Sequence, residues 1–260
     1  MGAWKAELAL EVASSAGRSV LSHRSDGPLV ILKPLYPEGP TVCHAIVVHP
    51  PGGIAGGDEL SLSVEAGGHA LLTSPGAAKW YRSAGPWARQ KLAFAVSGAL
   101  EWLPRETIVF DGALAELACE VRLAGEARYI GWEIVCLGRT GSGERFDRGR
   151  LRLHSRLSRD GKLLWMETGE IEGGGTLMRS PVGLGDQPVF GTLIATCDPS
   201  AAVLARCRTL AVTTVLPGVV VARYLGDSTE AAFRAFAAVW AVLRPQVLGR
   251  EAVPPRIWCT

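Results

Sequence analysis

Short runs of alternating apolar and polar residues, separated by glycine or proline, recur along almost the whole chain. In the first run, Ala6, Leu8, Leu10 and Val12 alternate with side chains that include charged ones. Successive side chains of a strand point to opposite faces, so this period of two predicts a strand with one buried face. More than a dozen such runs occur, and 31 glycines and 16 prolines supply the turns between them. We therefore expect a mainly β fold.

Two alanine-rich segments in the C-terminal half break this pattern and are predicted to be helices, over residues 199–210 and 228–243. Asp227 or Ser228 is a suitable cap for the second helix, and Pro245 is expected to stop it. Many short strands with few helices favour a multi-layered or coiled β architecture over an α/β one. No interior linker is visible, so residues 1–260 are expected to form a single domain.

The charge pattern argues against several classes of partner. The formal net charge is +2, from 27 basic and 25 acidic residues spread evenly, which gives no electrostatic footprint for nucleic acid or an anionic membrane. Charges, prolines or glycines interrupt every apolar stretch before the roughly 20 residues that cross a bilayer. The charged N-terminal residues do not resemble a secretory signal, so a cytoplasmic location is expected, with six reduced and mostly buried cysteines.

The most distinctive stretch, residues 49–58, places four glycines within six residues between two predicted strands. It is not a phosphate-binding loop, because no Gly-Lys-Ser/Thr closes it and no helix follows. A tight connection between strands explains the glycines, with His49 at its base and Asp58 capping the turn.

Other polar clusters offer only weak chemistry. Carboxylates near tryptophan, including Glu101, Glu133 and Glu144, would suit a glycosidase-like hydrolase that uses two acids, and this is the alternative function. The five histidines show no HxH or HExxH spacing, so no tightly bound metal or other cofactor is expected. Transient contacts between a cation and carboxylates remain open.

Taken together, the motifs resemble those of one family, the urease accessory proteins called UreD, or UreH in some bacteria. The resemblance runs from Ala6 to the end of the chain. It rests on the order and spacing of residues 27–39, 49–58, 76–83, 101–111, 131–133, 137–146 and 255–260.

The resemblance implies a β-helix-like coil of strands and a maturation chaperone without catalysis of its own. It also implies a cytoplasmic complex with UreF-like and UreG-like accessory proteins and the urease apoprotein, and it leaves a homodimer within that complex open. In such a complex the chain would help Ni²⁺ to reach the dinuclear urease site.

The resemblance also implies a water-filled internal path for the ion. Carboxylates that hold a divalent cation weakly enough to release it would suit that task. The residues that match family motifs are Asp58, Glu133 and Glu167, to which we add Ser83, Glu144 and His49. Each of them is also explained by an ordinary turn cap or ion pair. Thr168 follows Glu167 where many relatives are expected to carry arginine, which leaves a salt bridge at that place unsupported.

Overall fold

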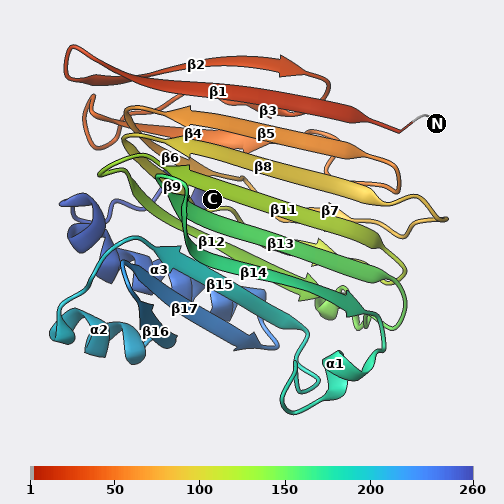
Figure 1. Cartoon of the computed structure of the whole chain (residues 1–260). Helices are drawn as coiled ribbons and strands as arrows, with labels where there is room; N and C mark the ends of the chain where they lie inside the picture. The colour runs from red at the N-terminus through yellow and green to blue at the C-terminus, as the bar shows by residue number, and fades with distance from the viewer. Residues whose placement is uncertain (1–2, 260) are drawn as a thin grey trace.

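The computed structural model describes residues 3–259, and two facing sheets dominate it (Figure 1). The first sheet has seven strands, in the order β14 (Lys162–Glu172), β13 (Arg150–Arg159), β11 (Leu114–Leu123), β8 (Ala88–Val96), β5 (Glu59–Ala66), β1 (Lys5–Ser15) and β2 (Arg18–Asp26). Its five central strands are parallel, and the two edge strands β14 and β2 are antiparallel to their neighbours.

The second sheet has ten strands. Eight follow in the order β16 (Val212–Leu216), β17 (Val219–Gly226), β15 (Val189–Ala195), β12 (Arg128–Leu137), β9 (Ala99–Trp102), β6 (His69–Thr73), β4 (Val42–Val48) and β3 (Val30–Ile31). The other two, β10 (Thr107–Val109) and β7 (Ala78–Trp80), extend from β12 in parallel. The strands from β4 to β12 are parallel, whereas β12, β15, β17 and β16 are antiparallel.

The prediction of a mainly β fold is confirmed, in the form of two mixed sheets. From β4 to β13 the chain passes repeatedly from one sheet to the other, and each return adds a parallel neighbour. Two cores result. One fills the space between the sheets, and the other lies between the outer face of the ten-stranded sheet and a long helix.

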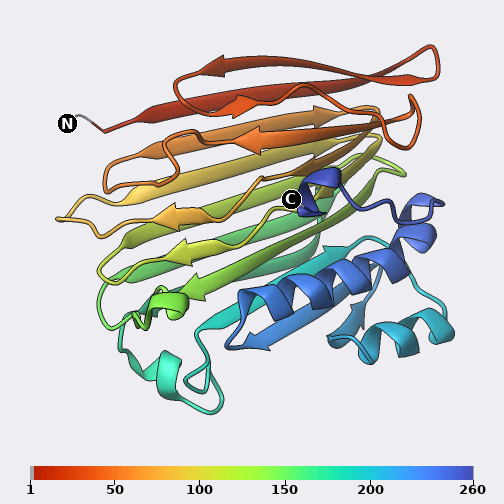
Figure 2. The same cartoon turned by 180° about the vertical axis from the view of Figure 1, so that it is seen from behind.

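That long helix, α3 (Thr229–Leu248), lies along the ten-stranded sheet, as Figure 2 shows from behind. Phe233, Phe236 and Trp240 recur at helical spacing and are buried against β12, β15 and β17. By length and composition α3 could also cross a membrane, and it is the only such helix in residues 3–259. Its packing on the sheet accounts for the same apolar character.

The helix predictions need two corrections. Residues 3–259 contain three α-helices rather than two, because a single turn, α1 (Thr176–Arg179), precedes α2 (Ala201–Arg208) and α3. Pro245 does not stop α3, which continues to Leu248 and ends at Gly249. The carbonyl of Pro245 still accepts the Gly249 N–H, and buried Val247 and Leu248 hold the last turn in the core. Two 3₁₀ turns, Thr140–Ser142 and Arg256–Cys259, complete the regular structure.

Candidate functional site

A cavity of about 380 Å³ lies between the two sheets. Most of its wall is apolar, with side chains that include Leu92 and Trp165 from the seven-stranded sheet and Val47 and Ile194 from the ten-stranded sheet. The polar residues that line it include His49, Cys119, Glu133, Glu167 and Thr192. Three of the six residues predicted for an ion path, His49, Glu133 and Glu167, therefore border one cavity.

Glu133 lies on β12, where its neighbours Trp132 and Ile134 point to the helix-side core. Alternation along the strand turns Glu133 the other way, toward the cavity. Within residues 3–259 its carboxylate makes no hydrogen bond or ion pair, and its pKa is raised to about 7 by burial and by the nearby charge of Glu167. A carboxyl in this state exchanges a proton near neutral pH and has lone pairs available for a cation.

Glu167 lies on β14, the edge strand of the seven-stranded sheet, and reaches across to the ten-stranded sheet. Arg223 on β17 donates to Glu167 Oε1, and Thr192 Oγ1 on β15 donates to Glu167 Oε2 over 3.3 Å. The sequence indicated no basic partner for Glu167, because Thr168 stands where many relatives are expected to carry arginine. The structure supplies the guanidinium from Arg223, 56 residues further along the chain.

His49 and Asp58 sit at the two ends of the glycine-rich loop that joins β4 to β5. Asp58 is buried and accepts the N–H groups of Trp4 and Ala55, each over 2.8 Å, so it caps the turn. Burial lowers the pKa of His49, while the charge of Asp58 opposes that shift. The charge of Asp58 therefore affects the pKa of His49, although Asp58 does not itself line the cavity.

Two glycines of this loop, Gly53 and Gly56, lie close against neighbouring side chains. A Cβ on Gly56 would lie 2.3 Å from Ser83 Oγ, and one on Gly53 would lie 2.1 Å from the Tyr81 ring. Ser83 itself donates to the Pro86 carbonyl over 2.5 Å and accepts from Gly85 N–H, so it orders its own turn. The loop is thus a close-packed connection between strands, as predicted.

Glu144 lies on the connection between β12 and β13. It accepts from Arg139 over 2.6 Å and from the backbone N–H of Asp111 over 3.1 Å. Ser83, Asp58 and Glu144 therefore all lie on connections that run from the ten-stranded to the seven-stranded sheet. The structure places these three outside the cavity lining.

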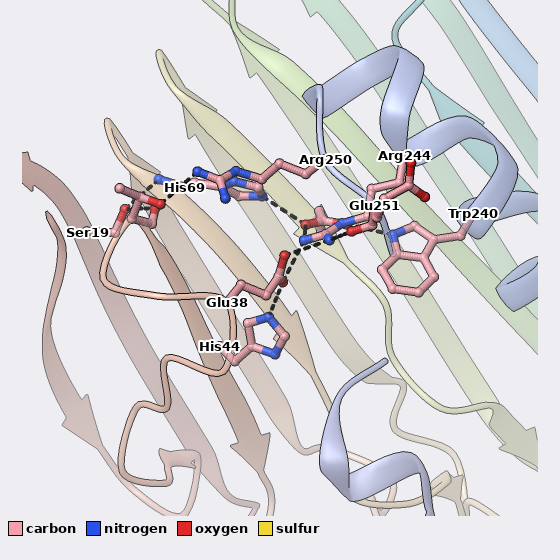
Figure 3. A network of polar contacts seen from close by, with 10 residues as sticks. Ser19, Glu38, His44, His69, Trp240, Arg244, Arg250 and Glu251 are labelled. Carbon is pink, nitrogen blue, oxygen red and sulfur yellow. Dashed lines mark hydrogen bonds and ion pairs between the residues drawn. The ribbon is translucent and has the colours of Figure 1, made fainter. Parts of the chain in front are cut away.

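A second charged feature is a buried network that joins α3 to the ten-stranded sheet (Figure 3). Arg244 is fully buried. Its Nε and Nη2 atoms donate to Glu101 over 2.9 and 3.0 Å, and its Nη1 and Nη2 atoms donate to Glu38 over 2.7 Å each. His69 contacts Glu101 over 2.8 Å, and His44 contacts Glu38 over 2.7 Å.

Burial alone would raise the pKa of Glu38, but hydrogen bonds from His44 and Arg244 lower it to about 2. The pKa of Glu101 is also lowered, because hydrogen bonds from His69 and Arg244 outweigh its burial. Both carboxylates are therefore ionised and paired. Glu101, one of the acids in the hydrolase alternative, is fully buried in this network and is closed to a substrate.

Two further residues of the cavity region were missed, although the sequence carried a signal for each. Cys119 follows Leu117 and precedes Val121 on the inward face of β11, and burial, together with the charges of Glu133 and Glu120, raises the pKa of its thiol. Arg223 shares a face of β17 with Val219 and Val221, where a charged residue is unexpected. A polar residue on an apolar stripe was the available signal in both cases.

The donors in the cavity do not form a closed metal site. Across the part of the chain that the structure describes, no three His, Cys, Asp or Glu side chains are arranged to hold a metal ion together. The cavity thus offers single carboxylates in a mostly apolar wall that also carries the basic residues Lys79, Arg105 and Arg156.

Comparison with known proteins decides the family. The profile of the UreD urease accessory protein family matches residues 5–259. The chain belongs to the UreD family. Its relatives include the urease accessory protein UreD of Azoarcus sp. strain BH72, 49% identical over 99% of this chain and 94% of that protein. UreD of Dechloromonas aromatica is 49% identical and UreD of Pseudomonas fluorescens Pf-5 is 50% identical, each over 99% of this chain and 95% of the relative.

The chain is accordingly a urease accessory protein involved in urease maturation, and it is a maturation factor rather than an enzyme. The resemblance inferred from the motifs is confirmed. The hydrolase alternative is not retained, because UreD proteins are non-catalytic maturation factors.

Proposed function

We propose that this UreD protein helps Ni²⁺ to reach the dinuclear urease site by giving the ion a transient path through the cavity between its sheets. The observation that carries the proposal is the position of Glu133, a carboxylate without a hydrogen-bonding or ionic partner in residues 3–259, on the cavity wall beside Glu167. The ion is cargo here. Isolated carboxylates in an apolar wall hold a divalent cation weakly, which permits release.

The surroundings of the cavity support passage. At one end, the lining includes the exposed residues Gly52, Pro75 and Gly76. At another point it includes Glu167, whose side chain is 37% exposed. We infer that the ion enters or leaves the cavity beside these exposed residues.

The proposal includes a cytoplasmic complex with UreF-like and UreG-like accessory proteins and the urease apoprotein. It also interprets the repeated passage of the chain between the two sheets as a β-helix-like coil that encloses the cavity. A pull-down from a lysate tests the partners, and recovery of none of these proteins would contradict this part of the proposal.

A complementation experiment tests the path. In a strain that lacks this gene, the wild-type chain restores urease activity and the nickel content of purified urease, and Glu133→Gln restores both only partly. Glu170→Gln is the matched control, because Glu170 pairs with Arg152 outside the cavity lining. Full restoration by Glu133→Gln overturns the path, and normal urease in the deletion strain overturns the role in maturation.

A further inference from the structure

Arg223 links the ten-stranded sheet to the edge strand of the seven-stranded sheet. It lies on β17 of the ten-stranded sheet and donates to Glu167 on β14, the edge strand of the seven-stranded sheet. The same nitrogen, Nη1, donates to Thr192 Oγ1 over 3.0 Å, and that hydroxyl donates to Glu167 Oε2 over 3.3 Å. Arg223 and Thr192 together hold the Glu167 carboxylate in one position.

This arrangement adjoins Glu133. Thr192 lies directly opposite Glu133 in the pairing of β12 with β15. Glu133, Glu167 and Thr192 all line the cavity, and the charge of Glu167 is felt at Glu133. This end of the cavity thus holds two carboxylates, of which one is paired with Arg223 and the other has no ionic partner within residues 3–259.

Glu167 lines the same cavity and its charge acts on Glu133, so it is the second carboxylate available to a divalent cation that reaches Glu133. To use that group, the cation has to compete with Arg223, because the guanidinium already occupies one oxygen of Glu167 and places a positive charge nearby. A guanidinium keeps its charge at every physiological pH, so the competition persists. Its side chain is 45% exposed and can swing into solvent without leaving a buried charge behind.

We propose that Arg223 is a tethered counter-ion that keeps Glu167 from joining Glu133 in a tight cation site, so that Ni²⁺ in the cavity stays weakly bound and is passed on. This inference rests on the proposed nickel path. It assigns Arg223 as a positioning residue for Glu167 and as the cause of weak retention.

Nickel binding to the purified full-length chain tests the inference, with NiSO₄ alone as the probe and isothermal titration calorimetry as the readout. Arg223→Gln removes the competing charge, and its Kd for Ni²⁺ is expected to be about tenfold lower than that of the wild type. Arg223→Lys keeps the charge and is expected to stay near the wild type. The double variant Arg223→Gln with Glu167→Gln is expected to lose the gain, since the freed carboxylate is gone.

Arg152→Gln is the matched control. Arg152 pairs with Glu170 over 2.7 Å, and the two side chains are 38% and 41% exposed, close to the values of Arg223 and Glu167. This pair lies outside the cavity lining, so its loss is expected to leave the Kd unchanged. Should Arg223→Gln lose the native circular dichroism spectrum, Arg223→Met, which keeps the aliphatic stem, carries the same test.

An unchanged Kd in the folded Arg223 variants, or the same gain in Arg152→Gln, overturns the inference. Urease activation separates this failure from that of the path itself. If Glu133→Gln impairs activation while Arg223→Gln matches the wild type in both Kd and activation, only the assignment of Arg223 is wrong. If Glu133→Gln activates urease normally, the path is wrong.

Discussion

Arg244 places a positive charge in the core beneath α3. Its two carboxylate partners determine how much unfolding free energy is lost when Arg244 is replaced. Its side chain is 0% exposed, and its two carboxylate partners are 4% and 0% exposed. Replacement by methionine leaves Glu38 and Glu101 buried without their main counter-charge. Breaking such a pair from one side costs about 3–5 kcal/mol of unfolding free energy.

Urea denaturation of Arg244→Met measures this loss directly. Arg234→Ala serves as the control on the same helix, because Arg234 and Glu230 form an exposed pair four residues apart. Its loss is expected to be no more than about 0.5 kcal/mol. Equal midpoints for Arg244→Met and the wild type would show that the network does not stabilise the fold.

The raised pKa of Glu133 predicts that its contribution to the unfolding free energy changes with pH in the opposite direction from that of most carboxylates. Its pKa is about 7 in the folded chain and near 4.5 when unfolded, so the folded state binds more protons between these values. Stability contributed by this group therefore falls as the pH rises from 4.5 to 7. The advantage of Glu133→Gln over the wild type in unfolding free energy should grow from pH 5 to pH 8 by on the order of 2 kcal/mol.

Glu144→Gln provides the contrast for that measurement. Hydrogen bonds from Arg139 lower the pKa of Glu144, so its carboxylate stabilises the folded state at neutral pH and less so in acid. The variant is expected to be less stable than the wild type at pH 8, with a smaller difference in acid. Parallel pH profiles for Glu133→Gln and Glu144→Gln would contradict the assignment of Glu133.

For single residues, the sequence indicated the face of the strand and the candidate role, but not the residue with which each one pairs. Alternation places Glu133 on the opposite face of β12 from Trp132, and the motif that contains it identified it as a candidate. Its relation to Glu167, and the pairing of Glu167 with Arg223, depend on which strands become neighbours. Likewise Glu101 and Arg244 lie 143 residues apart, and nothing local to either residue indicates the other.

At the level of secondary structure, the N-cap of α3 can be tested. The sequence left this cap undecided between Asp227 and Ser228. The structure assigns it to Ser228, whose Oγ accepts the Ala231 N–H over 3.2 Å. Ser228→Ala is expected to lower the free energy of unfolding by about 1 kcal/mol. Asp227→Ala is the control, and a larger loss in this variant than in Ser228→Ala would assign the cap to Asp227.

The elements also show where a sequence pattern reaches its limit. A period of two predicts a strand and its buried face, and the structure confirms this for β1, β5 and β8. The same pattern fits parallel and antiparallel neighbours, so the sheet order could not be predicted from it. The end of α3 was misplaced because Pro245 weakens a helix locally, whereas the packing of Val247 and Leu248 acts through the tertiary structure.

For the molecule as a whole, the two cores share one wall. The ten-stranded sheet contributes Tyr129 and Val135 to the core between the sheets, and Ile130 and Ile134 of the same strand to the core beneath α3. Neither core can open without exposing a face of β12 to water. This shared strand is the physical reason to expect residues 1–260 to fold as one domain.

Two buried thiols allow this expectation to be tested. Cys43 on β4 belongs to the core between the sheets, whereas Cys207 on α2 belongs to the core beneath α3, and both are buried and free. Burial raises the pKa of both thiols, so neither should be alkylated in the native state. During a slow temperature rise with iodoacetamide, peptide mass spectrometry should show both sites becoming labelled at the same temperature, together with the loss of circular dichroism. Exposed Cys259, labelled from the start, is the internal control. Labelling of Cys207 well before Cys43 would mean that the helix layer unfolds by itself and that the two cores are separate cooperative units.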